Sequence, residues 1–221
     1  MLGWLEFSLL DMTPYDRETW FNLLADYNLA VWPAYGLAFF LTLILLLALF
    51  KLGTQTSASI WARLPLSILA ASWIWTGAIF HMQYFSQLNW AASWFGLGFI
   101  IQGFMLLIAA FSLKPIWVSL TTPRGRLVLS LLVLGLVIYP LSGFFDNRRF
   151  AQLEWLPLLP TPVTLITFAT LMGLKTKWRH VLILIPIVWA IISAAFAATL
   201  GLLEVYFLAI VILMWGLSLF D

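Results

Sequence analysis

The sequence consists largely of long apolar stretches separated by short polar loops. An α-helix needs about 20 apolar residues to cross the hydrocarbon core of a bilayer, and we predict about seven helices of that length. The candidate segments are residues 29–50, 64–84, 91–113, 126–145, 156–174, 181–199 and 202–220. Only 9% of the 221 residues are charged, against about 25% in soluble domains. Because so few charges cannot cover a water-facing surface of this size, the sequence predicts an all-α, polytopic transmembrane helix bundle.

The fifth segment is the weakest of these candidates. Pro157, Pro160 and Pro162 interrupt its beginning, which leaves only about 20 Å of unbroken helix. That length is short of the hydrocarbon thickness of about 30 Å. The proline-rich lead must either lie in the interface or dip inward where protein or water satisfies its carbonyl groups.

Residues 1–28 are the most polar part of the chain. Thr13 and Pro14 suit the N-cap and first position of a helix, with Asp16 at the capping-box position. The apolar residues that follow fall on one broad face: Trp20, Phe21, Leu23, Leu24 and Tyr27. We expect an extracytoplasmic leader with an amphipathic helix on the membrane surface, followed by one transmembrane domain over residues 29–221. The alternative is an irregular polar leader.

Basic residues are divided unevenly between the two sets of loops. Three of the eleven Lys and Arg residues fall on the side of the N-terminus: Arg17, Arg148 and Arg149. The other eight fall on the opposite side: Lys51, Arg63, Lys114, Arg124, Arg126, Lys175, Lys177 and Arg179. Because cytoplasmic loops carry an excess of basic residues, we predict that the N-terminus is outside and the C-terminus is cytoplasmic. The expected location is a bacterial inner membrane.

The composition argues against several functional classes. The chain has no cysteine, which excludes disulfides, thiolate nucleophiles and Cys-ligated metal centres. His81 and His180 fall at opposite ends of the predicted spans and cannot ligate one haem. The basic residues form no stripe, so nucleic-acid binding is not expected. We predict no cofactor and no metal site, and we expect membrane lipids as partners, with other membrane subunits as a further option.

His81 is the first candidate functional residue, because ionisable side chains within a membrane are rare and usually functional. It lies near the outer end of the second segment, four residues after Gly77, which leaves room beside the imidazole for a ligand or a neighbouring backbone. The alternative is a structural histidine near the surface that bonds a loop carbonyl or water.

Three further polar residues require partners. Gln102 lies about 16 Å into the third segment, where its amide could contact a ligand or form an interhelical hydrogen bond. Asn89 lies in a tight turn, for which turn capping is the ordinary role. Glu204 lies near the outer end of the last segment and could pair with Arg148 or Arg149.

Thr161 lies between two prolines at the start of the fifth helix, where it could serve as the cap. If the lead dips inward, the free N–H groups of this helix face an outer cavity and attract anionic groups. The alternative is a proline-rich interfacial loop before a short tilted helix.

Three blocks of residues form a recognisable pattern. The central block contains Trp75, Gly77, Phe80, His81, Tyr84, Phe85, Asn89, Ala91, Ala92, Phe95, Gly96, Gln102 and Gly103. The flanking blocks are Tyr27, Asn28, Val31, Trp32 and Pro33, and then Pro160, Thr161, Pro162, Thr164, Thr167 and Phe168. Over about residues 27 to 175 the chain resembles an uncharacterised bacterial family of polytopic membrane proteins, a domain of unknown function. The resemblance implies membership but no activity. The family pattern has cysteine at Thr161 and glycine at Ala169, which puts a metal or redox role of that block in doubt here.

These observations support three hypotheses. The first is a protein that binds or transports a small polar or anionic ligand, or a lipid headgroup, in an outward-facing cavity. The residues expected there are His81, Asn89, Gln102, Thr161, Thr164, Trp75, Tyr84 and Glu204. The second is a non-catalytic accessory subunit whose surface, rich in the thirteen Trp and eighteen Phe residues, docks onto a larger membrane complex. The third is an intramembrane enzyme with His81 as acid or base, although no second catalytic group is evident.

Overall fold

The computed structural model describes residues 13–51 and 59–218, and these residues are organised into helices. The helices are α1 (Arg17–Ala30), α2 (Ala34–Phe50), α3 (Ile60–Trp75), η1 (Thr76–Tyr84), η2 (Phe85–Gln87), α4 (Ala92–Ser112), α5 (Pro123–Val133), η3 (Leu134–Ile138), α6 (Tyr139–Ser142), η4 (Phe150–Gln152), α7 (Pro160–Gly173), α8 (Arg179–Leu182), α9 (Leu184–Thr199) and α10 (Glu204–Leu217). Within the described residues the β-type pairing is one isolated bridge, between Trp117 and Leu174. The predicted all-α class is therefore confirmed. Residues 1–12 of the predicted leader and the C-terminal Asp221 lie outside the described part.

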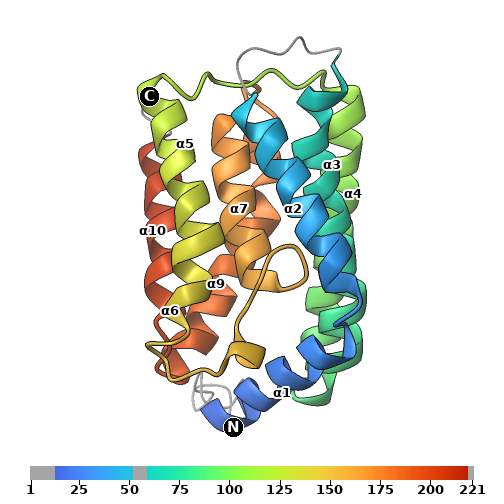
Figure 1. Ribbon diagram of the computed structural model, residues 1–221, viewed down its shortest axis with the longest axis vertical. Helices are drawn as coiled ribbons and strands as arrows, with labels where there is room; N and C mark the ends of the chain where they lie inside the picture. Colours follow the sequence, from blue (N-terminus) through green and yellow to red (C-terminus); the bar gives the residue numbers. More distant parts are fainter. Residues whose placement is uncertain (1–12, 52–58, 219–221) are drawn as a thin grey trace, which may run out of the picture.

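The long helices run alternately up and down between the two ends of one bundle (Figure 1). Among the described residues, four helical stretches are long and apolar enough to cross a membrane: Ile60–Gln87, Ala92–Ser112, Pro123–Ser142 and Arg179–Thr199. The pair α1 and α2, bent by 91°, adds a fifth if it is taken as one span. Helices α7 and α10 have 14 residues each, fewer than the about 20 that a full crossing needs. Membrane-length helices are thus confirmed for these stretches, while seven spans stay a prediction.

Helix α7 is the central element of the bundle (Figure 1). All of its residues are buried, and it packs against α3, α5, α9 and α10. Within it, the hydroxyl groups of Thr164 and Thr167 donate to the carbonyls of Pro160 and Val163, one turn earlier. A helix that other helices enclose need not match the thickness of a bilayer. This explains why the fifth segment is short.

Helix α4 packs tightly against α3 and η1 through glycine residues. A Cβ atom on Gly77 would lie 2.6 Å from the carbonyl oxygen of Gly96, and one on Gly103 would lie 2.8 Å from that of Ala70. Glycine therefore allows the two backbones to approach closely. The segment η1 is a π-helix, a form that is rare and often occurs at functional sites, and it contains His81.

Helix α1 lies across one end of the bundle (Figure 1). The predicted start was wrong: Asp16, not Thr13, is the N-cap, because its carboxylate accepts a hydrogen bond from the Thr19 backbone N–H at 2.8 Å. The predicted apolar face is confirmed, since its members are all buried: Trp20, Phe21, Leu23, Leu24 and Tyr27. This face meets the remainder of the protein, including η1 and η4.

The loops after α4 and α7 lie at the end opposite α1 (Figure 1). They carry Lys114, Lys175 and Lys177. The acidic residues Asp146, Glu154 and Glu204 lie instead in the loops and helix start nearest α1. Which end faces the cytoplasm stays a prediction.

Candidate functional site

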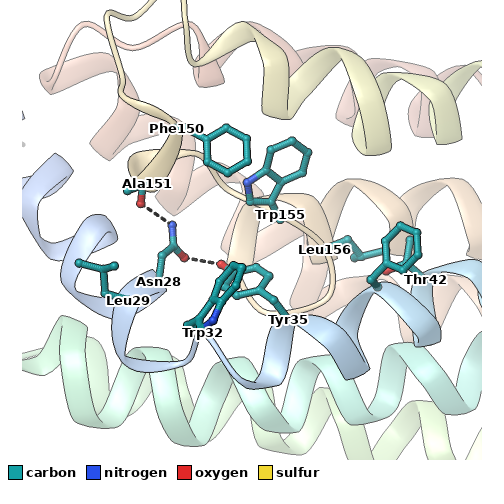
Figure 2. A pocket seen from close by; sticks show the side chains of 10 residues that line it. Asn28, Leu29, Trp32, Tyr35, Thr42, Phe150, Ala151, Trp155 and Leu156 are labelled. Carbon is teal, nitrogen blue, oxygen red and sulfur yellow. Dashed lines mark hydrogen bonds between the residues drawn. The ribbon is translucent and has the colours of Figure 1, made fainter.

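A groove of about 470 Å³ opens on the side of the bundle where α1 turns into α2 (Figure 2). The α1–α2 corner forms one wall, and η4 with the residues that follow it forms the other. Its lining residues are Asn28, Leu29, Trp32, Tyr35, Phe39, Thr42, Phe150, Ala151, Trp155 and Leu156. The groove thus joins a segment near the N-terminus to the proline-rich lead of α7.

Asn28 holds the two walls together at one end of the groove (Figure 2). Its side-chain amide donates to the carbonyl of Ala151 at 2.8 Å and to that of Leu153 at 3.0 Å. Its amide oxygen accepts a hydrogen bond from the Tyr35 hydroxyl. Both the nitrogen and the oxygen of the Asn28 amide already have hydrogen-bond partners. Asn28 therefore stabilises the wall of the groove and is not available to a ligand.

The lead of α7 enters the bundle as a buried, non-helical loop (Figure 1). At its centre the hydroxyl of Tyr27 donates to the Leu158 carbonyl at 2.7 Å, and it accepts from the indole N–H of Trp75 at 2.9 Å. The lead is therefore buried within the protein, with a side chain bonded to the Leu158 carbonyl, while its position relative to the membrane interface stays a prediction.

We expect Tyr27→Phe to lower the free energy of unfolding by about 1–3 kcal/mol, because it leaves the Leu158 carbonyl and the Trp75 N–H buried without partners. Tyr206→Phe is the matched control, since Tyr206 is 64% exposed. Unfolding by denaturant in detergent micelles measures both. Equal stability of the two variants would contradict this role of Tyr27.

The interior of the groove is almost entirely apolar and aromatic. Besides the Asn28 and Tyr35 pair, the Thr42 hydroxyl is also engaged, because it donates to the Ala38 carbonyl of its own helix at 2.9 Å. Trp32, 71% exposed, and the half-buried Trp155 stand on opposite walls. A ligand in this groove would therefore be held mainly by apolar contact.

A buried group of charged residues lies at the same end of the bundle, centred on Arg148. Its guanidinium donates to Glu154 at 2.7 Å and lies 3.8 Å from Asp146 and 4.0 Å from Glu204. Asp146 also forms an ion pair with Arg17 of α1 at 3.1 Å. Arg148 therefore links the loop after α6 to the lead of α7 and to the start of α10.

The surroundings of Arg148 keep it charged. Burial alone would lower its pKa, but the negative charge of Glu154 raises it, and the net effect holds the pKa of Arg148 above its usual value. Its guanidinium also lies 5.0 Å from the ring centre of Phe21 in α1, a cation–π arrangement. This fixed positive charge holds α1 against the end of the bundle.

Two of the predicted site residues, Thr161 and Glu204, are brought together. The Thr161 hydroxyl donates to a carboxylate oxygen of Glu204 at 2.7 Å, and Ser193 of α9 donates to the same oxygen at 2.7 Å. The predicted pairing of Glu204 with Arg148 is found at 4.0 Å. Thr164 bonds the Pro160 carbonyl within α7 and does not join this group.

Trp75 and Tyr84 both contact Tyr27. Trp75 donates to the Tyr27 hydroxyl, and the rings of Tyr27 and Tyr84 lie 5.1 Å apart, edge to face. These contacts support the inward loop described above. The upstream and central blocks of the sequence pattern are thus in contact.

His81 is fully buried in a cage of aromatic rings. The ring centres of Phe99 and Trp189 lie 4.4 Å and 4.8 Å from that of the imidazole, and Phe80, Phe85 and Phe95 complete the cage. Neither ring nitrogen has a hydrogen-bond partner among the described residues. The bond to a loop carbonyl, which was the alternative for a structural histidine, is therefore not found in that part of the chain.

Gln102 and Asn89 have the structural roles that the alternatives gave them. The amide of Gln102 donates to the Leu182 carbonyl at 2.8 Å, which ties α4 to the end of α8. The side chain of Asn89 accepts from the Ala91 backbone N–H at 2.9 Å, as in a turn cap. Among the described residues, no hydrogen bond joins His81, Asn89 or Gln102 to the Thr161–Glu204 group, so the eight predicted residues do not share the contacts expected of one site.

Sequence reasoning missed Glu154, Tyr139 and Tyr35. Tyr139 donates to Glu154 at 2.9 Å, which makes it part of the charged group around Arg148. The available signal was Glu154 itself, an acid directly before the apolar fifth segment. Tyr35 carries no comparable signal, because an aromatic residue at the start of an apolar helix is ordinary.

Comparison with known proteins places the chain in a family. No curated protein and no solved structure matches it. The family described as "Family of unknown function (DUF6064)" matches residues 17–220, nearly the whole length of the chain. The chain belongs to this family of unknown function.

Proposed function

We propose that the chain is an integral membrane protein that binds a lipid-like amphiphile in the groove beside the α1–α2 corner. The observation that carries this proposal is the size and chemistry of the groove. Its volume of about 470 Å³ is within the range of small-molecule sites, about 300–1,000 Å³. Because Asn28, Tyr35 and Thr42 already have hydrogen-bond partners, an apolar chain fits the interior of this groove better than the small polar ligand expected from the sequence.

The face of α2 beyond the groove supports a ligand with a long apolar chain. Tyr35, Phe39 and Thr42 line the groove, and Leu46 and Leu49 line a second apolar hollow between α2 and α5. Steps of three or four residues put all five on one face of the helix. An acyl chain laid along this face would run from the α1 end of the bundle toward the opposite end.

The two indole side chains support a polar head at the α1 end. Trp32 and Trp155 flank the groove there (Figure 2). Tryptophan is enriched at membrane–water boundaries, since it combines an apolar body with an N–H donor. In this proposal the α1 end is extracytoplasmic, as the loop charges predict, and the protein lies in a bacterial inner membrane with about seven spans.

Filling the groove tests the proposal. Thr42→Trp puts a large side chain into the groove, and the lost hydroxyl bonds only its own helix. With a single-chain lysophospholipid as the probe, we expect native mass spectrometry to show a bound lipid on the wild type and a loss of at least about tenfold in affinity, or about 1.4 kcal/mol, in the variant.

Ile108→Trp is the matched control, because Ile108 is a 63% exposed residue of α4 outside the groove. It should bind the probe as the wild type does. Equal binding by Thr42→Trp and Ile108→Trp, or no binding by the wild type, would refute the groove as the lipid site.

A further inference from the structure

A second, much smaller cavity lies within the same end of the bundle. Its volume is about 20 Å³, which is enough for one water molecule. Its walls include Glu204 and Tyr15 together with the two indoles of Trp20 and Trp189. This cavity is separate from the groove and shares no lining residue with it.

Two of the residues that line this cavity carry unpaired donors. The indole nitrogens of Trp20 and Trp189 are buried and have no hydrogen-bond partner within residues 13–51 and 59–218, although the two side chains are only 9% and 5% exposed. A buried N–H group without an acceptor costs free energy. A water molecule in the cavity would supply the missing acceptor and give Glu204 a polar neighbour.

The charges around Glu204 do not balance. The group contains three carboxylates, Asp146, Glu154 and Glu204, but two guanidinium groups, Arg17 and Arg148. Arg17 pairs with Asp146, and the short 2.7 Å contact of Arg148 goes to Glu154.

Among the described residues, Glu204 is therefore the carboxylate of this group with the most distant cation. Within the part of the chain that the structure describes, its nearest guanidinium nitrogen is 4.0 Å away, and its hydrogen bonds come from the neutral hydroxyls of Thr161 and Ser193. The other titratable groups that face it, Tyr15 and Tyr139, are neutral phenols that add no positive charge. A buried carboxylate that lacks a partner is costly, and binding a proton removes that cost.

We propose that Glu204 is a proton-binding site that holds a proton at neutral pH and contacts one buried water molecule in this cavity. The proton comes from water at the α1 end of the bundle and adds to a carboxylate oxygen, so the group becomes electrically neutral. This inference is independent of lipid binding in the groove.

Infrared spectroscopy of the purified full-length protein tests the proposal. We expect the wild type at neutral pH to show the absorption of a protonated carboxylic acid, which shifts in D₂O. The absorption should be lost in Glu204→Gln and kept in Glu18→Gln, which changes an exposed carboxylate outside this group. Its absence from the wild type, or its persistence in Glu204→Gln, would overturn the proposal.

Thermal unfolding of Glu204→Gln and Glu154→Gln gives a second test. Glutamine resembles a neutral glutamic acid, so Glu204→Gln should melt close to the wild type. Glu154→Gln removes the charged partner of Arg148 and should melt several degrees lower. An equal fall in melting temperature in the two variants would mean that Glu204 is ionised, against the proposal.

Thr161→Val provides a further infrared test that does not require Glu204→Gln to fold. Because it removes one hydroxyl from Glu204, the infrared absorption should stay but move in frequency. An absorption that does not move would belong to another carboxyl group and would refute the assignment.

Discussion

Replacing Arg148 with alanine should lower the free energy of unfolding by about 3–5 kcal/mol, the usual cost of removing one partner from a buried ion pair. The side chain is buried and contacts Glu154, Asp146 and Glu204. Without the guanidinium, the carboxylate of Glu154 remains buried without its partner at 2.7 Å. Reversible unfolding in mixed detergent micelles measures the loss.

Arg149→Ala is the control for this prediction, since it removes the same kind of side chain at the adjacent position. Arg149 is exposed and forms no ion pair among the described residues. Its replacement should change stability by no more than about 0.5 kcal/mol. If Arg148→Ala is as mild as Arg149→Ala, the charged group does not hold this end of the bundle together.

The second large effect is expected at the contact between α4 and η1. Gly96→Ala would put a Cβ atom 2.8 Å from the Gly77 carbonyl oxygen and 3.2 Å from the His81 Cβ atom. Backbone atoms cannot move aside as a flexible side chain can, so the helices must separate. We expect a loss of about 1–3 kcal/mol, the usual cost of overpacking.

Gly98→Ala, two residues further along α4, provides the comparison. A Cβ atom there meets nothing within 4 Å. Because alanine favours a helix over glycine, this change should be neutral or stabilising by up to about 1 kcal/mol. Thermal unfolding of the two variants tests the difference, and similar melting temperatures would show that the close glycine contact does not limit stability.

The prediction of helix α1 shows which features of a helix a local sequence pattern specifies. The spacing of Trp20, Leu24 and Tyr27 correctly predicted a buried apolar face, because helical periodicity is a property of the chain itself. The start was predicted three residues too early, at Thr13 instead of Asp16. Threonine and aspartate are both suitable caps, and which of them is used depends on where the helix meets the bundle.

Helix α7 shows the opposite case. Its prolines and its short length were evident in the sequence, but the sequence left its lead either in the interface or inside the protein. Tyr27 and Asn28, more than 120 residues away along the chain, hold the lead inside the bundle. No local pattern predicts hydrogen bonds between partners so far apart.

The sequence by itself determined the all-α class, the apolar helices and the family, because hydropathy, helical periodicity and motif spacing depend on residues that are near one another in the chain. Only the tertiary structure decided that Glu154 and Glu204 share Arg148, that His81 is enclosed by aromatic rings, and that α2 borders an apolar groove. The physical reason is that burial and pairing depend on which helices pack together. That packing brings together side chains from distant parts of the chain, and composition and spacing do not specify it.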